Sequence, residues 1–223
     1  MSFDRESVRS ALAEVRRRIR AAGGGDEVAI LPVTKAFGSE AIEVVRSLGH
    51  SAIGENYAQE LLTKRDVCAG VEVHFIGRLQ TNKVRQVAGL VSVYESVDRP
   101  KLAAEIARRD PGARVMIQVD TSSDPGKGGC PLSALDELVT VVDGLDLSLA
   151  GLMTVGPTHG GPEAARPGFR AVRAAVDRLG LAECSMGMTD DLEVAVQEGS
   201  TQVRVGSALF GERPVPTSDD QGR

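Results

Sequence analysis

The sequence is poor in the residues that mark specialised classes of protein. Its 223 residues contain no Trp and two Tyr, and aromatic residues make up 3% of the chain. Single-stranded nucleic acid is commonly bound by stacking on aromatic side chains, so this composition argues against that function. The formal net charge of −5 points the same way, because nucleic-acid-binding proteins are usually basic. We expect no nucleic-acid partner.

Cysteines and long apolar runs are also scarce. Cys68, Cys130 and Cys184 are odd in number and far apart, which fits neither a disulfide framework nor a paired-cysteine metal site. No apolar run approaches the roughly 20 residues that span a membrane. The opening residues MSFDRESVRS hold no apolar segment typical of a secretion signal. We expect reduced thiols, no membrane partner and a cytoplasmic location.

Short apolar segments alternate with segments of helical spacing along the whole chain. Strands are predicted at Val28–Thr34, Ser51–Gly54, Val71–Ile76, Leu90–Tyr94, Ala113–Val119, Leu147–Met153, Ala182–Met186 and Gln202–Val205. Helices are predicted at Asp4–Ala22, Ser39–Leu48, Tyr57–Ala69, Gln80–Ala88, Arg99–Arg109, Leu132–Asp143, Ala164–Leu179 and Asp190–Glu198. Each predicted strand is followed by a helix or a helical turn, which favours parallel strands joined by helical crossovers.

Eight such units are the count of a TIM (β/α)8 barrel, an α/β fold. We therefore predict one barrel domain over residues 1–213 with an extra N-terminal helix, followed by a disordered tail over residues 214–223. A doubly wound open sheet is the alternative. It usually carries a Gly-rich fingerprint after its first strand, where this chain has Lys35-Ala36-Phe37-Gly38 instead.

Candidate functional residues stand at the predicted strand ends, where barrels of this type place their chemistry. Lys35 follows the first strand on the face of Leu31 and Val33. In a functional interpretation its amine forms an imine or contacts a phosphate. In a structural interpretation it is a lysine at the rim, paired with an acid such as Glu55. Arg204 shares a face of the last strand with Gln202 and Gly206. Gly206-Ser207 opens a short helix that suits a phosphate. An amine, a phosphate cradle and an arginine facing a ring nitrogen together indicate pyridoxal 5'-phosphate (PLP).

Several longer runs carry a resemblance to a known family. They include Pro32-Val33-Thr34-Lys35, GENYAQE over residues 54–60, HFIGRLQTNK over 74–83, SMGMTDD over 185–191 and VRVGSALFG over 203–211. The chain resembles the pyridoxal phosphate homeostasis proteins, which share a PLP barrel with the N-terminal domain of alanine racemase. The resemblance implies an aldimine of PLP on Lys35 and Arg204 at the pyridine nitrogen. It also implies a phosphate site of Ser185, Met186, Gly206 and Ser207, and a pocket lined by Asn56, His74 and Met153. From the residues alone, a hydrogen-bonded structural histidine is the favoured interpretation of His74.

The same resemblance bears on catalysis. Racemases that are similar to this chain use a second acid or base, a tyrosine from a separate β-domain, and we expect no room for such a domain here. Neither Tyr57 nor Tyr94 is obviously aimed at the imine. An arginine at the ring nitrogen also discourages protonation of the ring and so weakens it as an electron sink. We therefore expect a protein of intracellular PLP homeostasis without turnover of its own.

As partners we expect PLP itself and apo PLP-dependent enzymes, with the chain a monomer or a weak dimer. Two alternatives remain open at this point. One is a small PLP-dependent amino-acid racemase or lyase that uses Lys35. The other is a barrel that binds a different phosphorylated metabolite.

Overall fold

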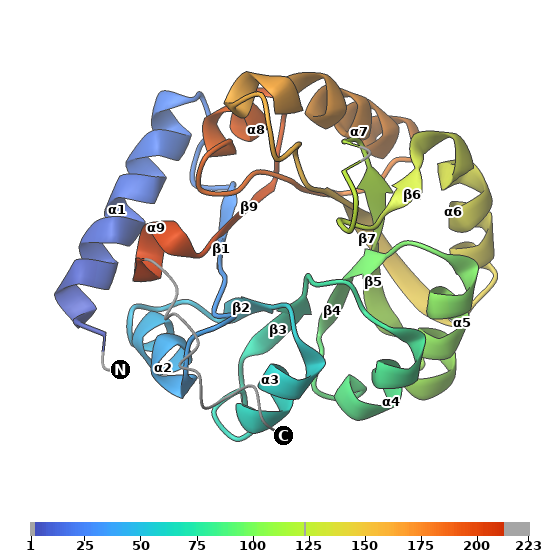
Figure 1. The fold of residues 1–223 in the computed structure, drawn as a ribbon, viewed down its shortest axis with the longest axis horizontal. Helices are drawn as coiled ribbons and strands as arrows, with labels where there is room; N and C mark the ends of the chain where they lie inside the picture. Colours follow the sequence, from blue (N-terminus) through green and yellow to red (C-terminus); the bar gives the residue numbers. More distant parts are fainter. Residues whose placement is uncertain (1–2, 123, 212–223) are drawn as a thin grey trace.

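A ring of parallel strands enclosed by helices forms the body of the protein (Figure 1). The structure is a computed structural model that describes residues 3–122 and 124–211, so the predicted tail over 214–223 lies outside the described residues. The strands are β1 Ala29–Pro32, β2 Ala52–Glu55, β3 Glu72–Phe75, β4 Val93–Val97, β5 Ala113–Asp120, β6 Cys130–Pro131, β7 Leu147–Thr154, β8 Glu183–Ser185 and β9 Gln202–Val205.

The strand order confirms the predicted (β/α)8 barrel. Neighbouring strands run β1-β9-β8-β7-β5-β4-β3-β2, and every pairing is parallel. A single parallel bridge between Val33 and Gly54 closes the ring between its two ends. The two-residue strand β6 pairs only with β5 and lies off this path. Because the strands are parallel, all their carboxyl ends meet at one mouth of the barrel.

Helices cover the outside of the ring (Figure 1). They are α1 Arg5–Ala21, α2 Ser39–Ser47, α3 Ala58–Thr63, α4 Val84–Val87, α5 Pro100–Arg109, α6 Leu135–Asp143, α7 Arg166–Arg178, α8 Leu192–Gln197 and α9 Ser207–Phe210, with 3-10 turns at Thr81–Lys83, Leu132–Ala134 and Pro162–Ala165. Helix α1 buries Val8, Val15 and Ile19, and the Asp4 side chain caps its first turn. This extra helix packs against α8 and α9.

Several predicted elements differ from the structure in their bounds, and strand β4 and helix α3 are two of them. Strand β4 covers Val93–Val97 rather than Leu90–Tyr94, because the buried Glu95 and Ser96 continue the strand where their polarity suggested a loop. Helix α3 ends at Thr63 instead of reaching Ala69. The chain turns at Lys64, whose ammonium group donates to the carboxylates of Glu55 and Glu60.

The two faces of the strands differ in chemistry. The outer face packs on the helices through a large apolar core, which includes Val73, Ile117 and Val203. The inner face has a small apolar cluster of Val93, Met116 and Met153. Leu31 and Val33 are also buried there, beside the buried polar side chains of His74, Glu95 and Arg204.

Candidate functional site

A cavity of about 210 Å³ opens at the carboxyl-terminal mouth of the barrel. Its lining includes Lys35 after β1, Arg204 from β9, and Gly206 and Ser207 at the start of α9. Val33, Ile76, Met188, Thr189 and Asp190 complete it. Four of the nine residues predicted for the site therefore meet on one cavity. They come from opposite ends of the chain, and they meet because β1 pairs with β9.

Arg204 lies just below this cavity, on the inner face that the alternation along β9 predicted. The side chain is buried, with 4% of its surface exposed. Its Nη1 donates to the Ser185 carbonyl at 2.7 Å and to the Ser185 hydroxyl at 2.8 Å, and its Nη2 donates to the Thr154 carbonyl at 2.7 Å. A guanidinium has five N–H donors. Among the described residues, the Nε–H and one Nη2 hydrogen have no acceptor, so this buried group can still donate to a ligand.

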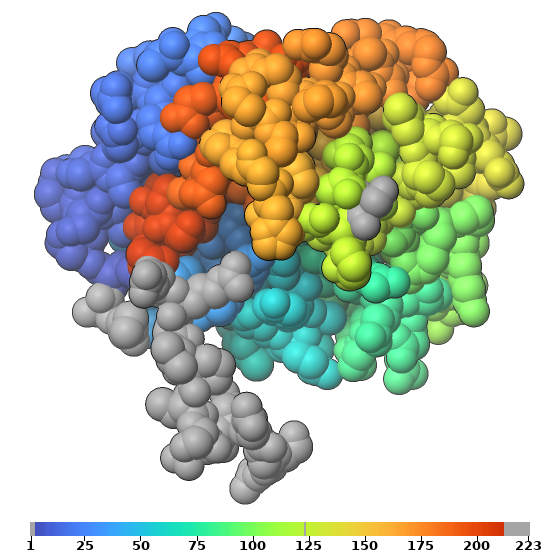
Figure 2. All heavy atoms as spheres, turned by 45° about the horizontal axis from the view of Figure 1, so that its top comes forward, coloured from blue at the N-terminus to red at the C-terminus, as the bar shows by residue number. Residues whose placement is uncertain are grey.

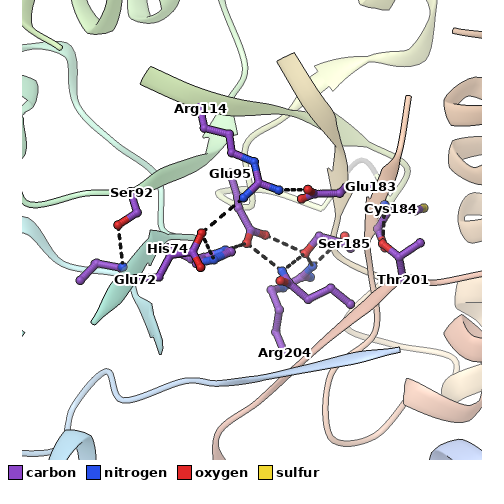
Figure 3. A network of polar contacts seen from close by, with 12 residues as sticks. Glu72, His74, Ser92, Glu95, Arg114, Glu183, Cys184, Ser185, Thr201 and Arg204 are labelled. Carbon is purple, nitrogen blue, oxygen red and sulfur yellow. Dashed lines mark hydrogen bonds and ion pairs between the residues drawn. The ribbon is translucent and has the colours of Figure 1, made fainter. Parts of the chain in front are cut away.

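Glu95 provides a buried negative charge close to Arg204 (Figure 3). Its carboxylate is fully buried and accepts hydrogen bonds from His74 Nδ1 at 2.5 Å, Ser185 Oγ at 2.6 Å and Gln202 Nε2 at 2.8 Å. Desolvation alone would raise the pKa of Glu95. The hydrogen bond and charge of His74, the charge of Arg204 and the Ser185 hydroxyl outweigh it and lower that pKa. Glu95 is thus held as a carboxylate.

Burial also lowers the pKa of Arg204, and the charges of Glu95 and Asp191 oppose that change. Arginine remains protonated in proteins because its pKa starts so high. The pair therefore consists of a buried cation and a buried anion, joined through the Ser185 hydroxyl, which donates to Glu95 and accepts from Arg204. Ser185 is the bridge between the two charges.

The polar network continues to the opposite, amino-terminal mouth of the barrel (Figure 3). His74 Nε2 lies 3.8 Å from a carboxylate oxygen of Glu72, and Arg114 forms ion pairs with Glu72 and Glu183. These residues line a second cavity, of about 330 Å³. His74 therefore lines the cavity at the amino-terminal mouth. It is connected to the cavity with Lys35 only through hydrogen bonds that run by way of Glu95 and Ser185 to Arg204.

The loops after β8 and β9 meet beside Lys35. The Ser207 hydroxyl lies 3.1 Å from the Thr189 hydroxyl, which connects the two loops. The first N–H groups of a helix have no partner within the helix, and they favour an anion. Helix α9 opens with Ser207, so its hydroxyl and its first N–H groups border the cavity from one side.

The other predicted site residues lie elsewhere. Met153 is buried in the barrel interior, and Met186 lies in the outer core with its N–H donated to the Gln202 carbonyl. Asn56 lines a separate cavity of about 280 Å³ together with Lys83, and its Oδ1 is buried without a hydrogen-bond partner. Ser185 is fully buried beneath the mouth and bonds Arg204 and Glu95.

A further cavity, of about 340 Å³, adjoins the one with Lys35, since Met188 and Asp190 line both. The loops after β5 and β7 meet there, and they form the yellow-green and golden surface at the front of Figure 2. Lys127 donates to the Gly156 carbonyl at 2.5 Å and pairs with Asp124 at 2.6 Å. The amine of Lys127 is therefore engaged within its own loops.

The described residues also bear on metal binding, membrane insertion and disulfide formation. Within residues 3–122 and 124–211, no cluster of three or more His, Cys, Asp or Glu side chains is arranged to hold a metal ion. None of the helices in those ranges has the length and apolar character needed to cross a membrane. The three cysteines are free and buried, as expected.

Sequence reasoning missed Glu95 and Thr154, and it noted Gln202 only as a residue on the same strand face as Arg204, without its bonds to Glu95 and Ser185. The signal for Glu95 is an acid inside an apolar strand, two residues after Val93 and hence on the same face. It was hidden because the strand was predicted to end at Tyr94. Gln202 carries a similar signal, since it stands two residues before Arg204.

Comparison with known proteins places this site in a family. A family model described as alanine racemase, N-terminal domain, matches residues 4–214. The pyridoxal phosphate homeostasis protein of Aquifex aeolicus is 37% identical over 222 residues, which cover 93% of this chain and 97% of that protein. This chain belongs to the pyridoxal phosphate homeostasis protein family. The resemblance drawn from the sequence motifs is thereby confirmed.

Two solved structures of similar proteins agree with the fold. An unknown protein from Bifidobacterium adolescentis has a TM-score of 0.83 and 31% identity, and the match covers 92% of this chain and 95% of that one. PipY of Synechococcus elongatus, solved with PLP bound, has a TM-score of 0.79 and 26% identity, with coverage of 92% and 100%. The family's barrel is thus the architecture described above.

Proposed function

We propose that this protein binds PLP at the carboxyl-terminal mouth of its barrel, linked to the amine of Lys35, and that it serves PLP homeostasis in the cytoplasm. The observation that carries the proposal is the meeting of Lys35, Arg204, Gly206 and Ser207 on one cavity. The homeostasis proteins in its family and the PLP-bound PipY support it.

The residues present fit the chemical groups of PLP. The amine of Lys35 suits the aldehyde, and the free N–H donors of the buried Arg204 suit an acceptor such as the pyridine nitrogen. Ser207 and the start of α9 suit the phosphate. When bound, PLP supplies a reactive aldehyde that condenses with amines. Ser185 supports this pocket through Arg204, whereas the Met186 N–H is already used in the barrel wall.

We further propose that the protein does not turn over a substrate. Neither tyrosine of the chain lines the cavity with Lys35. Tyr57 is 55% exposed beside the Asn56 cavity, and Tyr94 is buried with its hydroxyl donated to Asp110 at 2.8 Å. Burial and Asp110 also raise the pKa of Tyr94, which makes it a poor base. The role that fits the absence of a tyrosine base among the described residues of this cavity is that of a carrier, which transfers PLP to apo enzymes.

The test is borohydride reduction of the PLP-loaded protein, followed by mapping of the modified lysine. We expect the adduct on Lys35, and we expect its loss in Lys35→Ala but not in the matched variants Lys83→Ala and Lys127→Ala. An adduct on Lys83 or Lys127 in the wild-type protein would contradict the assignment. Rapid deuterium exchange at the α-carbon of alanine would instead support the racemase alternative.

A further inference from the structure

The segment that presents Lys35 is a tight turn, Thr34–Phe37, which we call the Lys35 turn. The Phe37 N–H donates to the Thr34 carbonyl at 3.2 Å and closes it. Ala36 has φ +64, the left-handed region that favours glycine, and it is the one non-glycine residue of the described chain in that region. A side chain there costs conformational energy, so the surroundings must hold it in place.

Glu60 holds the strained residue directly. The Ala36 N–H donates to Glu60 Oε1 at 2.7 Å. Glu60 lies in α3, one helical turn before Lys64. It is the last residue of the GENYAQE segment, and Lys64 follows that segment. The proposed PLP pocket does not explain the role of this segment. The hydrogen bond reaches across from a separate element, so it fixes the backbone of the residue after Lys35.

Lys64 and Glu55 hold the residue before Lys35. The Lys64 ammonium donates to the Thr34 carbonyl at 2.9 Å, to Glu55 Oε1 at 2.8 Å and to Glu60 Oε1 at 2.5 Å. The Thr34 hydroxyl donates to the same Glu55 oxygen at 2.5 Å. All three N–H donors of Lys64 are therefore used, and they tie both flanks of Lys35 to one buried cation.

Burial makes this arrangement unusual for a merely stabilising contact. Lys64 is 4% exposed and Glu55 is fully buried. Desolvation of two such charges offsets most of their attraction, so a buried ion pair adds little net stability compared with apolar side chains of similar size. Its clearest consequence is geometric, because it sets where the Thr34 carbonyl and the Ala36 N–H lie.

We propose that Glu55, Glu60 and Lys64 form an ionic clamp of positioning residues that fixes the Lys35 turn and so directs the amine of Lys35 at its cavity. The inference rests on the proposed function, in which that amine condenses with the PLP aldehyde. In this step the nitrogen of Lys35 bonds to the aldehyde carbon, and the aldehyde oxygen leaves as water with the two amine protons. The clamp contacts neither reactant and acts only through the backbone of the turn.

The experiment follows the rate and extent of PLP linkage by the absorbance of the imine. Glu60→Ala removes the acceptor for the Ala36 N–H and should slow linkage about fivefold to tenfold, given the usual cost of a left-handed residue. Glu60→Gln keeps an oxygen at that place and should slow it less. Adding Ala36→Gly to Glu60→Ala should bring the rate back to within about twofold of wild type, because glycine adopts this φ without help.

Glu43→Ala is the matched control, since Glu43 is an exposed glutamate on α2. Thermal unfolding of each variant separates the effect on linkage from an effect on folding. Equal linkage rates in Glu60→Ala and Glu43→Ala would overturn the clamp, as would a failure of Ala36→Gly to restore the rate. If Glu60→Ala does not fold, Lys64→Met replaces it, and an unchanged linkage rate there overturns the clamp. A wild-type protein that forms no link at Lys35 would instead defeat the proposed function.

Discussion

Two buried glutamates in this barrel show how differently one side chain can behave at the same burial. Glu95 and Glu55 are both fully buried, and each lies near a buried cation, Arg204 or Lys64. Both oxygens of Glu95 accept hydrogen bonds. Glu55 receives Thr34 and Lys64 on one oxygen only, and its Oε2 has no partner.

The pKa values of the two glutamates move in opposite directions as a result. Desolvation dominates at Glu55 and raises its pKa despite the charge and hydrogen bonds of Lys64 and Thr34. At Glu95 the donors outweigh desolvation and the pKa falls. Burial alone therefore does not decide the charge of a carboxylate; the donors on its two oxygens and the charges around it also contribute. Glu95 serves as a fixed anion below the cavity, and Glu55 as a weaker partner in a shared clamp.

The largest effect is expected from removing the two charges in turn. Glu95→Gln removes the larger of the two negative charges that act on the buried Arg204 cation, which should cost about 3–5 kcal/mol in the free energy of unfolding. Glu55→Gln should cost clearly less, because Lys64 keeps Glu60 and the Thr34 carbonyl. Urea unfolding at neutral pH measures both. Equal losses of unfolding free energy in the two variants would show that the two carboxylates contribute equally to stability.

Arg204→Gln tests the other half of the Glu95 pair. The variant lacks the charged donors that face the cavity, so PLP should bind more weakly by about 1.5–3 kcal/mol, the usual worth of a hydrogen bond from a charged group. Titration of PLP into the wild-type and variant proteins gives the two dissociation constants. Identical constants would mean that Arg204 serves Glu95 and the barrel wall alone. The variant should not gain racemase activity, because no second base is supplied.

The dependence of stability on pH should also separate the two glutamates. The lowered pKa of Glu95 gives stability that is complete above its ordinary value near 4.5 and is lost as pH falls through the lower folded value. The raised pKa of Glu55 works in reverse, and its contribution is lost as pH rises above 4.5 through the higher folded value. Each group changes the slope by at most about 1.4 kcal/mol per pH unit.

Unfolding free energies measured from about pH 3 to pH 8 check these signs. Relative to wild type, Glu95→Gln should flatten the acid side of the profile, and Glu55→Gln should flatten the side toward neutral pH. If both variants flattened the same side, one of the two pKa directions would be wrong.

The smallest effect is expected at the bridge between Glu95 and Arg204. Ser185→Ala removes the hydroxyl that donates to Glu95 and accepts from Arg204, but the Ser185 carbonyl still binds Arg204. We expect a loss of about 1.5 kcal/mol in unfolding free energy, the lower end of the usual range for a hydrogen bond to a charged group. PLP affinity should fall slightly in parallel. A loss as large as that of Glu95→Gln would show that the hydroxyl, and not the ion pair, organises the interior.

The fold could be predicted because alternation of apolar strands and amphipathic helices is a local pattern. The bounds of β9 were predicted to the residue, since Gln202–Val205 lies between a glycine-marked turn and the Gly206-Ser207 step. β4 was misplaced because a strand that faces a polar barrel interior does not look apolar on both sides. Its Glu95 is buried by partners on β3, β8 and β9, which no local pattern reveals.

The site divides in the same way. Lys35, Arg204, Gly206 and Ser207 could be brought together because all four stand near strand ends that a barrel places at one mouth. The clamp residues Glu60 and Lys64 escaped notice, since their helix position favours exposed side chains and only the turn at Lys64 brings the ammonium inward. Residue identity alone did not show that Met186 uses its N–H in the barrel wall.

The pairing of β1 with β9 has a consequence for folding during synthesis of the chain. Synthesis runs from the amino terminus, so Lys35 leaves the ribosome well before Arg204 and Ser207. Strand β1 has no β9 to pair with during that interval, and long-range pairings of this kind form late in folding. A nascent chain can therefore offer a lysine amine but no pocket. Under the proposed function, tight capture of PLP would begin only after the last strand has joined the first.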